Sequence, residues 1–227
     1  MMYDYKIAGL NVKMDVCGRT QELALPFQIH VDAQPDITIE PVYGTGITES
    51  EEYILTGREF YHQLIGFSGM VLHASAVVKD EKAYLFCADS GGGKSTHTKL
   101  WRQLFGDDNV RILNDDKPAL RLEDNRWYAY GTPWSGKYGL SLNLRYPVAG
   151  ICFLEKAEKN KIEKYTKNDL VFQFMKQTYR PPNMRQRERL LLLLDDLLGK
   201  IPIWYMECNM EPEAAHMSCH AMTVKEC

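Results

Sequence analysis

With 227 residues, 45% of them hydrophobic, and a net charge of −3, the chain can bury a sizeable core and has no general attraction to nucleic acid or anionic membranes. No stretch approaches the roughly 20 apolar residues of a membrane span, and the N-terminus lacks the basic start and apolar block of a signal peptide. We therefore expect a cytoplasmic protein without nucleic-acid or membrane partners.

The first part of the chain shows the alternation that is typical of β-strands. Apolar and polar residues alternate over 5–12 until a break at 17–18, and they alternate again over 37–42 before the turn residues 43–46. A short amphipathic helix is expected over 59–65. These elements predict a small β-rich unit at the N-terminus.

The next elements are expected to be a hairpin followed by a helix. Residues 70–78 and 83–87 predict two strands, which the polar turn 79–82 joins. The second strand runs directly into a glycine-rich segment. A helical pattern follows that segment and stops at 106–108.

The remainder of the chain alternates strands with helices. Further strands are expected at 110–113, 119–122, 127–130 and 148–154. A long helix is expected over 184–198, followed by a strand at 203–206 and a last helix from about Glu211. This order indicates an α/β fold with a mixed β-sheet. We expect residues 1–66 to form a β-rich subdomain and residues 67–227 to form the main domain.

The glycine-rich segment has the features of a phosphate-binding loop. Its residues are Ser90, Gly91, Gly92, Gly93, Lys94, Ser95 and Thr96. In such a loop the glycines turn backbone N–H groups toward the phosphates, a lysine reaches the terminal phosphates, and a hydroxyl ligates Mg²⁺. The N-terminus of the following helix also favours the anion. We expect this loop to bind a nucleoside triphosphate, with Ser95 as a magnesium ligand. The usual first glycine is replaced by Ala88, so the backbone there must keep a negative φ.

An acidic pair follows the strand at 110–113. Asp115 and Asp116 stand at the end of that strand, where adjacent side chains point in different directions. One carboxylate can therefore ligate the metal while the other faces a phosphate acceptor. The alternative is an Asx turn before Lys117 and Pro118.

Together these residues resemble the catalytic domain of HPr kinase/phosphorylase, within the phosphoenolpyruvate carboxykinase P-loop group. The matching segments are 72–77, 89–96 and 114–116, and the segment 131–137 resembles that of the small HPr kinase-like proteins. The resemblance covers residues 67–155 well and the C-terminal third loosely. It implies a P-loop kinase domain of this type, preceded by the β-rich N-terminal segment.

The resemblance also implies roles for single residues. Asp115 would take the proton of the acceptor hydroxyl, Asp116 and Ser95 would ligate Mg²⁺, and His73 would lie near the phosphates, unless His73 is simply a core residue of its strand. Lys137 and Arg145 flank the segment 131–136 and are candidates for a cation that meets the charge of the transferring group, the alternative being ordinary surface cations.

We expect an ATP- and Mg²⁺-dependent kinase that acts on a hydroxyl, either serine in a protein or peptide or free serine. The Arg-Gly-Leu-Gly-type signature of the family is missing, so the acceptor stays open, as does the choice among ATP, GTP and pyrophosphate. Carboxykinase-like chemistry on a small acid is a second possibility, although no second metal cluster of Lys and His is visible. A nucleotide-dependent binding module is a third. An oligomer is possible.

Three further groups of residues lie outside the loop and the acidic pair. His216, Cys219 and His220 have helical spacing that could suit a metal, but a plain helix face is favoured. Cys87 and Cys152 lie in apolar runs and are expected to be buried thiols. Four arginines surround the expected start of the long helix, where the helix dipole disfavours cations. They are Arg180, Arg185, Arg187 and Arg189, and they either contact an anionic substrate or form a solvated face.

Overall fold

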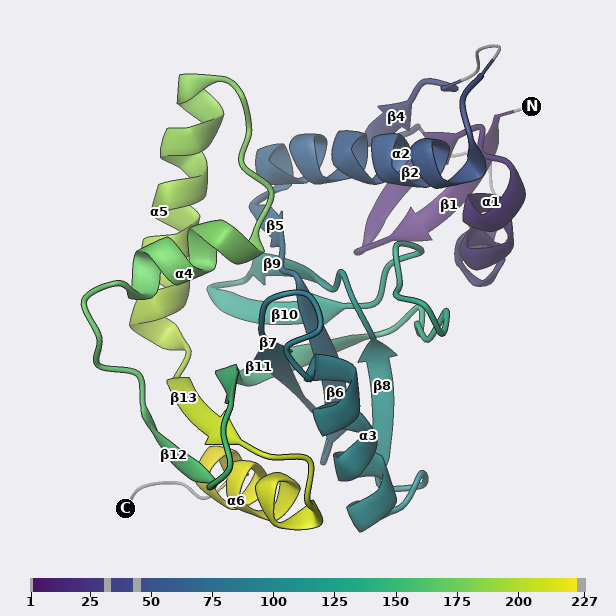
Figure 1. The fold of residues 1–227 in the computed structure, drawn as a ribbon. Helices are drawn as coiled ribbons and strands as arrows, with labels where there is room; N and C mark the ends of the chain where they lie inside the picture. The colour runs from purple at the N-terminus through teal and green to yellow at the C-terminus, as the bar shows by residue number, and fades with distance from the viewer. Residues whose placement is uncertain (1, 31–33, 43–45, 224–227) are drawn as a thin grey trace.

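The computed structural model describes residues 2–30, 34–42 and 46–223. Two β-sheets and the helices that pack on them make up the fold, which is a mixed α/β arrangement (Figure 1). Among the described helices, none combines the length and apolarity that would be needed to cross a membrane.

The smaller sheet has four strands in the order β3-β1-β2-β4. These are β1 (Tyr3–Ile7), β2 (Leu10–Met14), β3 (Gln28–Ile29) and β4 (Ile37–Ile39). The alternating run 5–12 is therefore a hairpin rather than one strand. Ala8 and Gly9 both have positive φ, of 51° and 75°, which forms the tight turn of a two-residue hairpin. Most of the turn expected at 43–46 lies outside the described residues.

Two helices pack with this sheet, α1 (Gly18–Ala24) and α2 (Glu49–Leu64). The short helix expected at 59–65 is only the end of α2. Its true start is a capping box, in which the Thr48 hydroxyl accepts from the backbone N–H of Glu51 and the Glu51 carboxylate accepts from that of Thr48. The Thr-x-x-Glu spacing is a sequence signal of a helix N-terminus, so the sequence does contain the information that places the start of α2.

The larger sheet contains nine strands and carries the rest of the predicted elements. Its strands are β5 (Gly69–Val71), β6 (Ala74–Lys79), β7 (Lys82–Cys87), β8 (Val110–Asn114), β9 (Ala119–Glu123), β10 (Arg126–Tyr130), β11 (Arg145–Lys156), β12 (Lys161–Lys164) and β13 (Ile203–Cys208). The expected β6–β7 hairpin is confirmed. The single strand expected over 70–78 is wrong, because Leu72 and His73 separate β5 from β6, and β5 pairs with β9 instead.

Strand direction brings several chain segments to one edge of this sheet. The strands β7 and β11 are parallel, and so are β11 and β13, whereas β6 is antiparallel to both β7 and β8. The carboxyl ends of β7, β8, β11 and β13 therefore lie at the same edge, where β6 begins. The glycine-rich loop, the acidic pair and His73 all stand at this edge.

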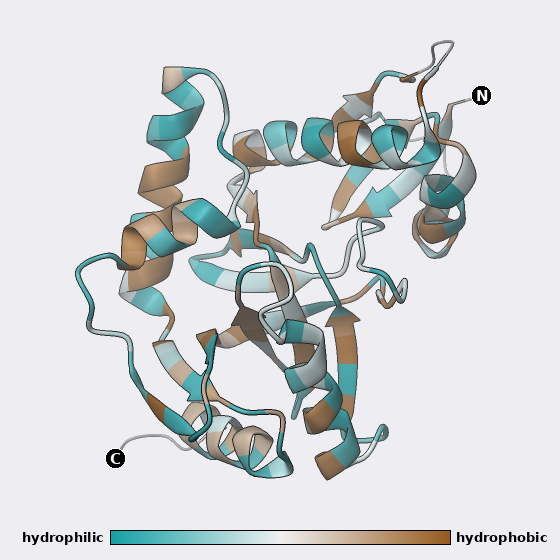
Figure 2. Ribbon diagram, in the orientation of Figure 1, coloured by the Kyte–Doolittle hydropathy of each residue, from teal (hydrophilic) through white to brown (hydrophobic). Residues whose placement is uncertain are grey.

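Helices cover both faces of the sheet. Helices α3 (Lys94–Phe105) and α6 (Pro212–Thr223) pack on one face, and α4 (Leu170–Gln177) and α5 (Met184–Lys200) pack on the other with β5, β9 and β10. The helices expected after the loop, over 184–198 and from about Glu211 are confirmed, while α4 was not anticipated. Apolar residues gather on the central strands and in the middle of α5 (Figure 2).

The N-terminal unit shares its core with the larger sheet. Phe60 and Leu64 of α2 belong to the same buried cluster as Val71, Ala119 and Trp134, which lie beyond residue 66. A boundary between residues 66 and 67 therefore divides the chain without dividing the apolar core. The N-terminal unit therefore packs directly against the larger sheet.

Candidate functional site

The glycine-rich loop links the end of β7 to the start of α3. Gly91 and Gly93 have φ values of 74° and 98°, a region that favours glycine, and α3 begins directly at Lys94. The strand, the left-handed glycines and the helix start thus occur in the order that the sequence predicts. Backbone N–H groups at the start of α3 are available to an anion.

Ala88 fits into the loop because Gly92 leaves room for its methyl group. Ala88 has no positive φ, as its side chain requires. A Cβ added at Gly92 would lie only 2.7 Å from the Cβ of Ala88 and 2.9 Å from the backbone oxygen of Asp89. The substitution at the first glycine position is therefore compensated by the absence of a side chain at Gly92.

The lysine of the loop is buried and folded back on the loop itself. Lys94 Nζ donates to the carbonyl oxygen of Ala88 at 2.8 Å and to that of Asp89 at 3.4 Å. Burial lowers the pKa of Lys94, and the nearby carboxylate of Asp116 opposes this effect. Lys94 and Asp116 are therefore close enough to interact electrostatically.

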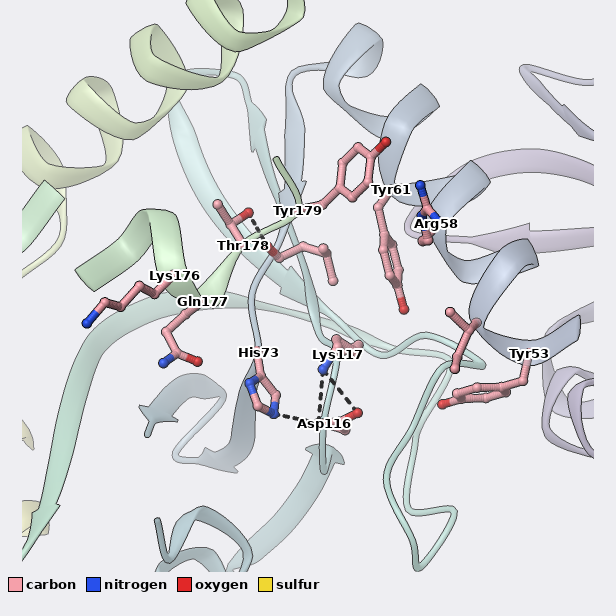
Figure 3. A pocket seen from close by; sticks show the side chains of 12 residues that line it. Tyr53, Arg58, Tyr61, His73, Asp116, Lys117, Lys176, Gln177, Thr178 and Tyr179 are labelled. Atoms are coloured by element: carbon pink, nitrogen blue, oxygen red, sulfur yellow. Dashed lines mark hydrogen bonds and ion pairs between the residues drawn. The ribbon is translucent and has the colours of Figure 1, made fainter. Parts of the chain in front are cut away.

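Asp116 is held by two basic side chains, as Figure 3 shows. His73 Nε2 lies 3.1 Å from Asp116 Oδ1, and Lys117 Nζ lies 3.2 Å from both carboxylate oxygens. Burial alone would raise the pKa of Asp116, but the hydrogen bond from His73 and the positive charge of Lys117 outweigh it and lower the pKa. Asp116 is therefore an ionised carboxylate at neutral pH.

Asp115 has a different environment. Its Oδ1 accepts a hydrogen bond of 2.5 Å from the backbone N–H of Gly136, while its buried Oδ2 has no hydrogen-bond partner. Burial raises the pKa of Asp115, partly offset by the hydrogen bond from Gly136. An unpartnered buried carboxylate oxygen is costly, and it leaves one acceptor position available to a ligand.

The acidic pair also sits in the Asx turn that the sequence offered as an alternative. Asn114 Oδ1 accepts from the backbone N–H of Asp116 at 2.9 Å and from that of Lys117 at 2.6 Å. The two carboxylates have different partners, Gly136 for Asp115 and His73 with Lys117 for Asp116. The turn and a pair of carboxylates with separate roles are therefore compatible.

The segment 131–137, here called the 131–137 loop, connects the N-terminal unit to Asp115. Tyr53 Oη donates to the carbonyl oxygen of Ser135 at 2.5 Å, and Arg19 Nη2 donates to that of Gly136 at 2.7 Å. Gly136 in turn donates to Asp115. Residues of α1 and α2 thus fix the backbone that holds one acid of the pair.

Trp134 anchors the same loop in the shared core. Its fully buried ring stacks on Phe60 with centroids 4.8 Å apart, and its Nε1 donates to the Thr56 hydroxyl at 3.3 Å. A Cβ at Gly57 would lie 2.8 Å from the Trp134 ring, so the glycine of α2 makes room for the indole.

The two candidate cations for the transferring group are placed differently. Lys137 is exposed and directly follows Gly136, whose backbone N–H binds Asp115. Arg145 pairs with Glu123, donates to Tyr130 Oη at 3.3 Å and lies over the Tyr128 ring, in a network on β9 and β10. The structure therefore does not bring Arg145 to the acids. The lysine that does contact the acidic pair is Lys117, which the sequence indicated only as part of a turn.

The contacts that His73 and Lys117 both make with Asp116 also bear on the carboxykinase-like alternative. A cluster of Lys and His that is not visible in the sequence does form in the fold. Its signal in the sequence is weak, because His73 lies between β5 and β6 and Lys117 between β8 and β9, and the two meet only at the shared edge.

Three hollows border the loop and the acidic pair. The α2–α4 cleft, of about 430 Å³, has His73, Asp116 and Lys117 at its base (Figure 3). The α3 groove, of about 570 Å³, lies in front of Asp115. The β11–β13 cavity, of about 390 Å³, borders Asp89 and Gly92 of the loop. Each volume lies within the usual range of small-molecule sites.

The remaining sequence candidates are the arginines near the start of α5, the cysteines and the segment 216–220. Arg187 Nε donates to Pro181 O at 2.7 Å and Arg189 Nη2 donates to Gly66 O at 2.8 Å, so two of the four arginines bind main-chain carbonyls. Cys87, Cys152 and Cys219 are buried thiols. Residues 216–220 lie in α6, and within the described ranges no group of three His, Cys, Asp or Glu side chains is placed to hold a metal ion.

Comparisons with known proteins do not identify a family for this chain. No protein-family model and no curated protein matches the chain. Among solved structures, the chain is similar to the Hpr(Ser) kinase/phosphatase from Coxiella burnetii, with 13% sequence identity and a TM-score of 0.38 over 66% of this chain and 96% of that chain. A likeness at this level does not establish a family, so the function is argued from the site.

Proposed function

We propose that the protein is an ATP- and Mg²⁺-dependent phosphotransferase that transfers the γ-phosphoryl group to a serine hydroxyl. The observation that carries this proposal is the meeting of Lys94, His73 and the acidic pair at one edge of the larger sheet. These side chains come from three segments that are separate in sequence. Phosphoryl transfer depends mainly on positioning and on charge stabilisation, which such a convergence supplies.

The loop holds the donor phosphates. Gly91 and Gly93 allow the backbone N–H groups to turn toward the phosphates, and Lys94 exchanges its contacts with Ala88 and Asp89 for phosphate oxygens. The intraloop contacts of Lys94 compensate its buried charge in the absence of an anion. Binding a triphosphate therefore replaces weak carbonyl contacts with strong ion pairs.

The donor set of the site fits Mg²⁺. Hydroxyl and carboxylate oxygens are the ligands that Mg²⁺ prefers, and Ser95 and Asp116 would hold the ion. The pKa of Asp116 is lowered by His73 and Lys117, which keeps the carboxylate ionised as a metal ligand must be. When bound, Mg²⁺ neutralises negative charge on the phosphate oxygens.

Asp115 is suited to accept the proton of the acceptor hydroxyl. Its raised pKa makes it a stronger base than Asp116, and its Oδ2 is free to receive a hydrogen bond. Gly136 fixes the orientation of the carboxylate through Oδ1. Lys137 follows Gly136 directly, and we assign it to the charge of the transferring group.

The hollow in front of Asp115 favours a serine within a peptide or protein over free serine. The α3 groove, at about 570 Å³, is much larger than a serine side chain, and it is bordered by the exposed side chains of Tyr138 and Leu140 and by Lys99. An extended segment could lie along this groove with its serine at Asp115. A free amino acid would leave most of the groove empty.

Incubation with ATP, Mg²⁺ and either free serine or serine-containing peptides tests the proposal, with mass analysis of the acceptor. A gain of one phosphate on a peptide serine is expected. ATP loss without any phosphorylated acceptor would instead support a nucleotide-dependent module that hydrolyses ATP slowly.

Carboxykinase-like chemistry on a small acid stays as a second candidate because of the α2–α4 cleft. Arg58 and Lys176 line this cleft above the cluster of His73, Asp116 and Lys117, and they could hold a carboxylate. On this second proposal, Arg58→Gln should raise the KM for a small acid. If the protein is instead a serine kinase, the same variant should leave the KM for the peptide unchanged.

A further inference from the structure

The β11–β13 cavity borders the loop on the side away from the acidic pair. Asp89 and Gly92 of the loop line it together with residues at the carboxyl ends of β11 and β13. The strand order places β11 on one side of β7, and β6 and β8 on the other. The cavity and the acids thus lie on opposite sides of the loop.

This arrangement sets the direction of a bound triphosphate. If the proposed function holds, the γ-phosphate points toward Asp116 and His73, at the ends of β8 and β6. The nucleoside end must then leave the loop on the opposite side, over β11 and β13. The hollow that borders the loop on that side is the β11–β13 cavity.

The walls of the cavity carry aromatic rings. Tyr165 and Tyr205 meet edge to face with centroids 5.9 Å apart, and Lys167 Nζ lies 3.6 Å from the centroid of the Tyr205 ring. Tyrosine rings are common stacking partners of nucleobases. This hollow therefore places two tyrosine rings beside the phosphate loop, whereas the α3 groove has one, Tyr138.

Polar groups in the cavity suit a nucleoside as well. Glu155 accepts a hydrogen bond from Tyr205 Oη, and Asp169 accepts one of 3.0 Å from Tyr165 Oη. A carboxylate has more acceptor positions than one hydroxyl fills. The remaining positions can accept from ribose hydroxyls or a base amino group. Lys167 and Lys176 also line the cavity and add positive charge to it.

We propose that the nucleoside portion of ATP binds in the β11–β13 cavity, with Tyr165 and Tyr205 contacting the base. This proposal rests on the function proposed above, and it assigns donor recognition to residues outside the phosphate loop. The α2–α4 cleft and the α3 groove then remain for the acceptor, on the side of the acids.

Calorimetric titration of the full chain with ATP and with inorganic tripolyphosphate tests the assignment, in the presence of Mg²⁺. Tyr205→Leu and Tyr165→Leu should each weaken ATP binding about tenfold, because each removes a ring that the base contacts. Both variants should bind tripolyphosphate as the unaltered chain does. Tyr205→Phe keeps the ring and should retain ATP affinity, and Tyr3→Leu, in the N-terminal sheet, is the matched control.

The outcomes separate the two proposals. If the unaltered chain binds neither ATP nor tripolyphosphate, the proposed function fails. If both ligands bind but the leucine variants leave ATP affinity unchanged, or weaken ATP and tripolyphosphate equally, the nucleoside assignment is overturned and the proposed function stands. Circular dichroism of each variant shows whether the fold is kept, and Tyr165→Leu decides the question if Tyr205→Leu does not fold.

Discussion

The backbone N–H of Gly136 donates a hydrogen bond of 2.5 Å to Oδ1 of Asp115. Because Tyr53 and Arg19 bind the carbonyl oxygens of Ser135 and Gly136, the N-terminal unit reaches the acidic pair through two peptide groups. Asp115 is thus oriented by a loop whose own position depends on α1 and α2.

Removing the Tyr53 hydroxyl should slow transfer without weakening nucleotide binding. Tyr53→Phe keeps the ring under Arg19 and deletes only the hydrogen bond to Ser135. A bond of this kind contributes about 0.5–1.5 kcal/mol, so kcat should fall about two- to tenfold. Steady-state kinetics and ATP titration measure the two effects, with Tyr3→Phe as the control. A variant that loses ATP affinity as much as kcat would show that Tyr53 does not act through the loop.

Truncating Trp134 should destabilise the whole protein. The indole is fully buried between α2 and the 131–137 loop. Trp134→Ala should therefore lower the free energy of unfolding by about 3–5 kcal/mol, as measured by urea denaturation. Trp134→Phe keeps the stacking on Phe60 and should lose less. Equal stability of Trp134→Ala and the unaltered chain would mean that the loop is not anchored by this side chain.

A methyl group at Gly92 should impair phosphate binding. The added Cβ would lie 2.7 Å from the Cβ of Ala88, so the loop must shift to accept it. Gly92→Ala should weaken ATP binding, and the double variant Ala88→Gly with Gly92→Ala should recover part of the loss. Calorimetric titration of the unaltered chain, the two single variants Ala88→Gly and Gly92→Ala, and the double variant checks this. Independent, additive effects of the two substitutions would contradict the proposed compensation.

Stability should fall in mild acid because of His97. Burial lowers the pKa of His97 to about 4 from the ordinary 6.5. Between pH 6.5 and 4, His97 therefore binds a proton in the unfolded chain but not in the folded chain. Stability therefore decreases as pH falls from 6.5 toward 4, by on the order of 3 kcal/mol in total. His97→Gln can keep the contact with Ser218 and should show a smaller decrease. Urea denaturation at pH 7.5 and 5 measures the difference, and identical pH dependence of the two proteins would contradict the assignment.

The sequence predicted the parts of the site that depend on local patterns. The strand before Ala88, the glycines, and the helix after Gly93 follow each other along the chain, so local rules suffice for them. The same holds for the β6–β7 hairpin, whose turn residues Asp80 and Glu81 both have positive φ.

The missed features depend on contacts between distant segments. Lys117 was assigned to a turn, yet its side chain contacts Asp116, as does His73 from the segment between β5 and β6. Tyr53 and Arg19 carry no motif, and their role exists only because α1 and α2 pack on the 131–137 loop. Arg145 was favoured for its closeness in sequence to that loop, but Glu123 on β9 binds it instead.

The division of roles between the two aspartates is the central claim of the proposed function. Asp115→Asn should keep Mg²⁺-dependent ATP binding and lower peptide phosphorylation by about a hundredfold or more, because the amide cannot accept the proton. Asp116→Asn should instead weaken ATP binding in the presence of Mg²⁺. Parallel measurement of ATP affinity and phosphate transfer in the two variants tests this most directly. Normal phosphate transfer by Asp115→Asn would contradict the account.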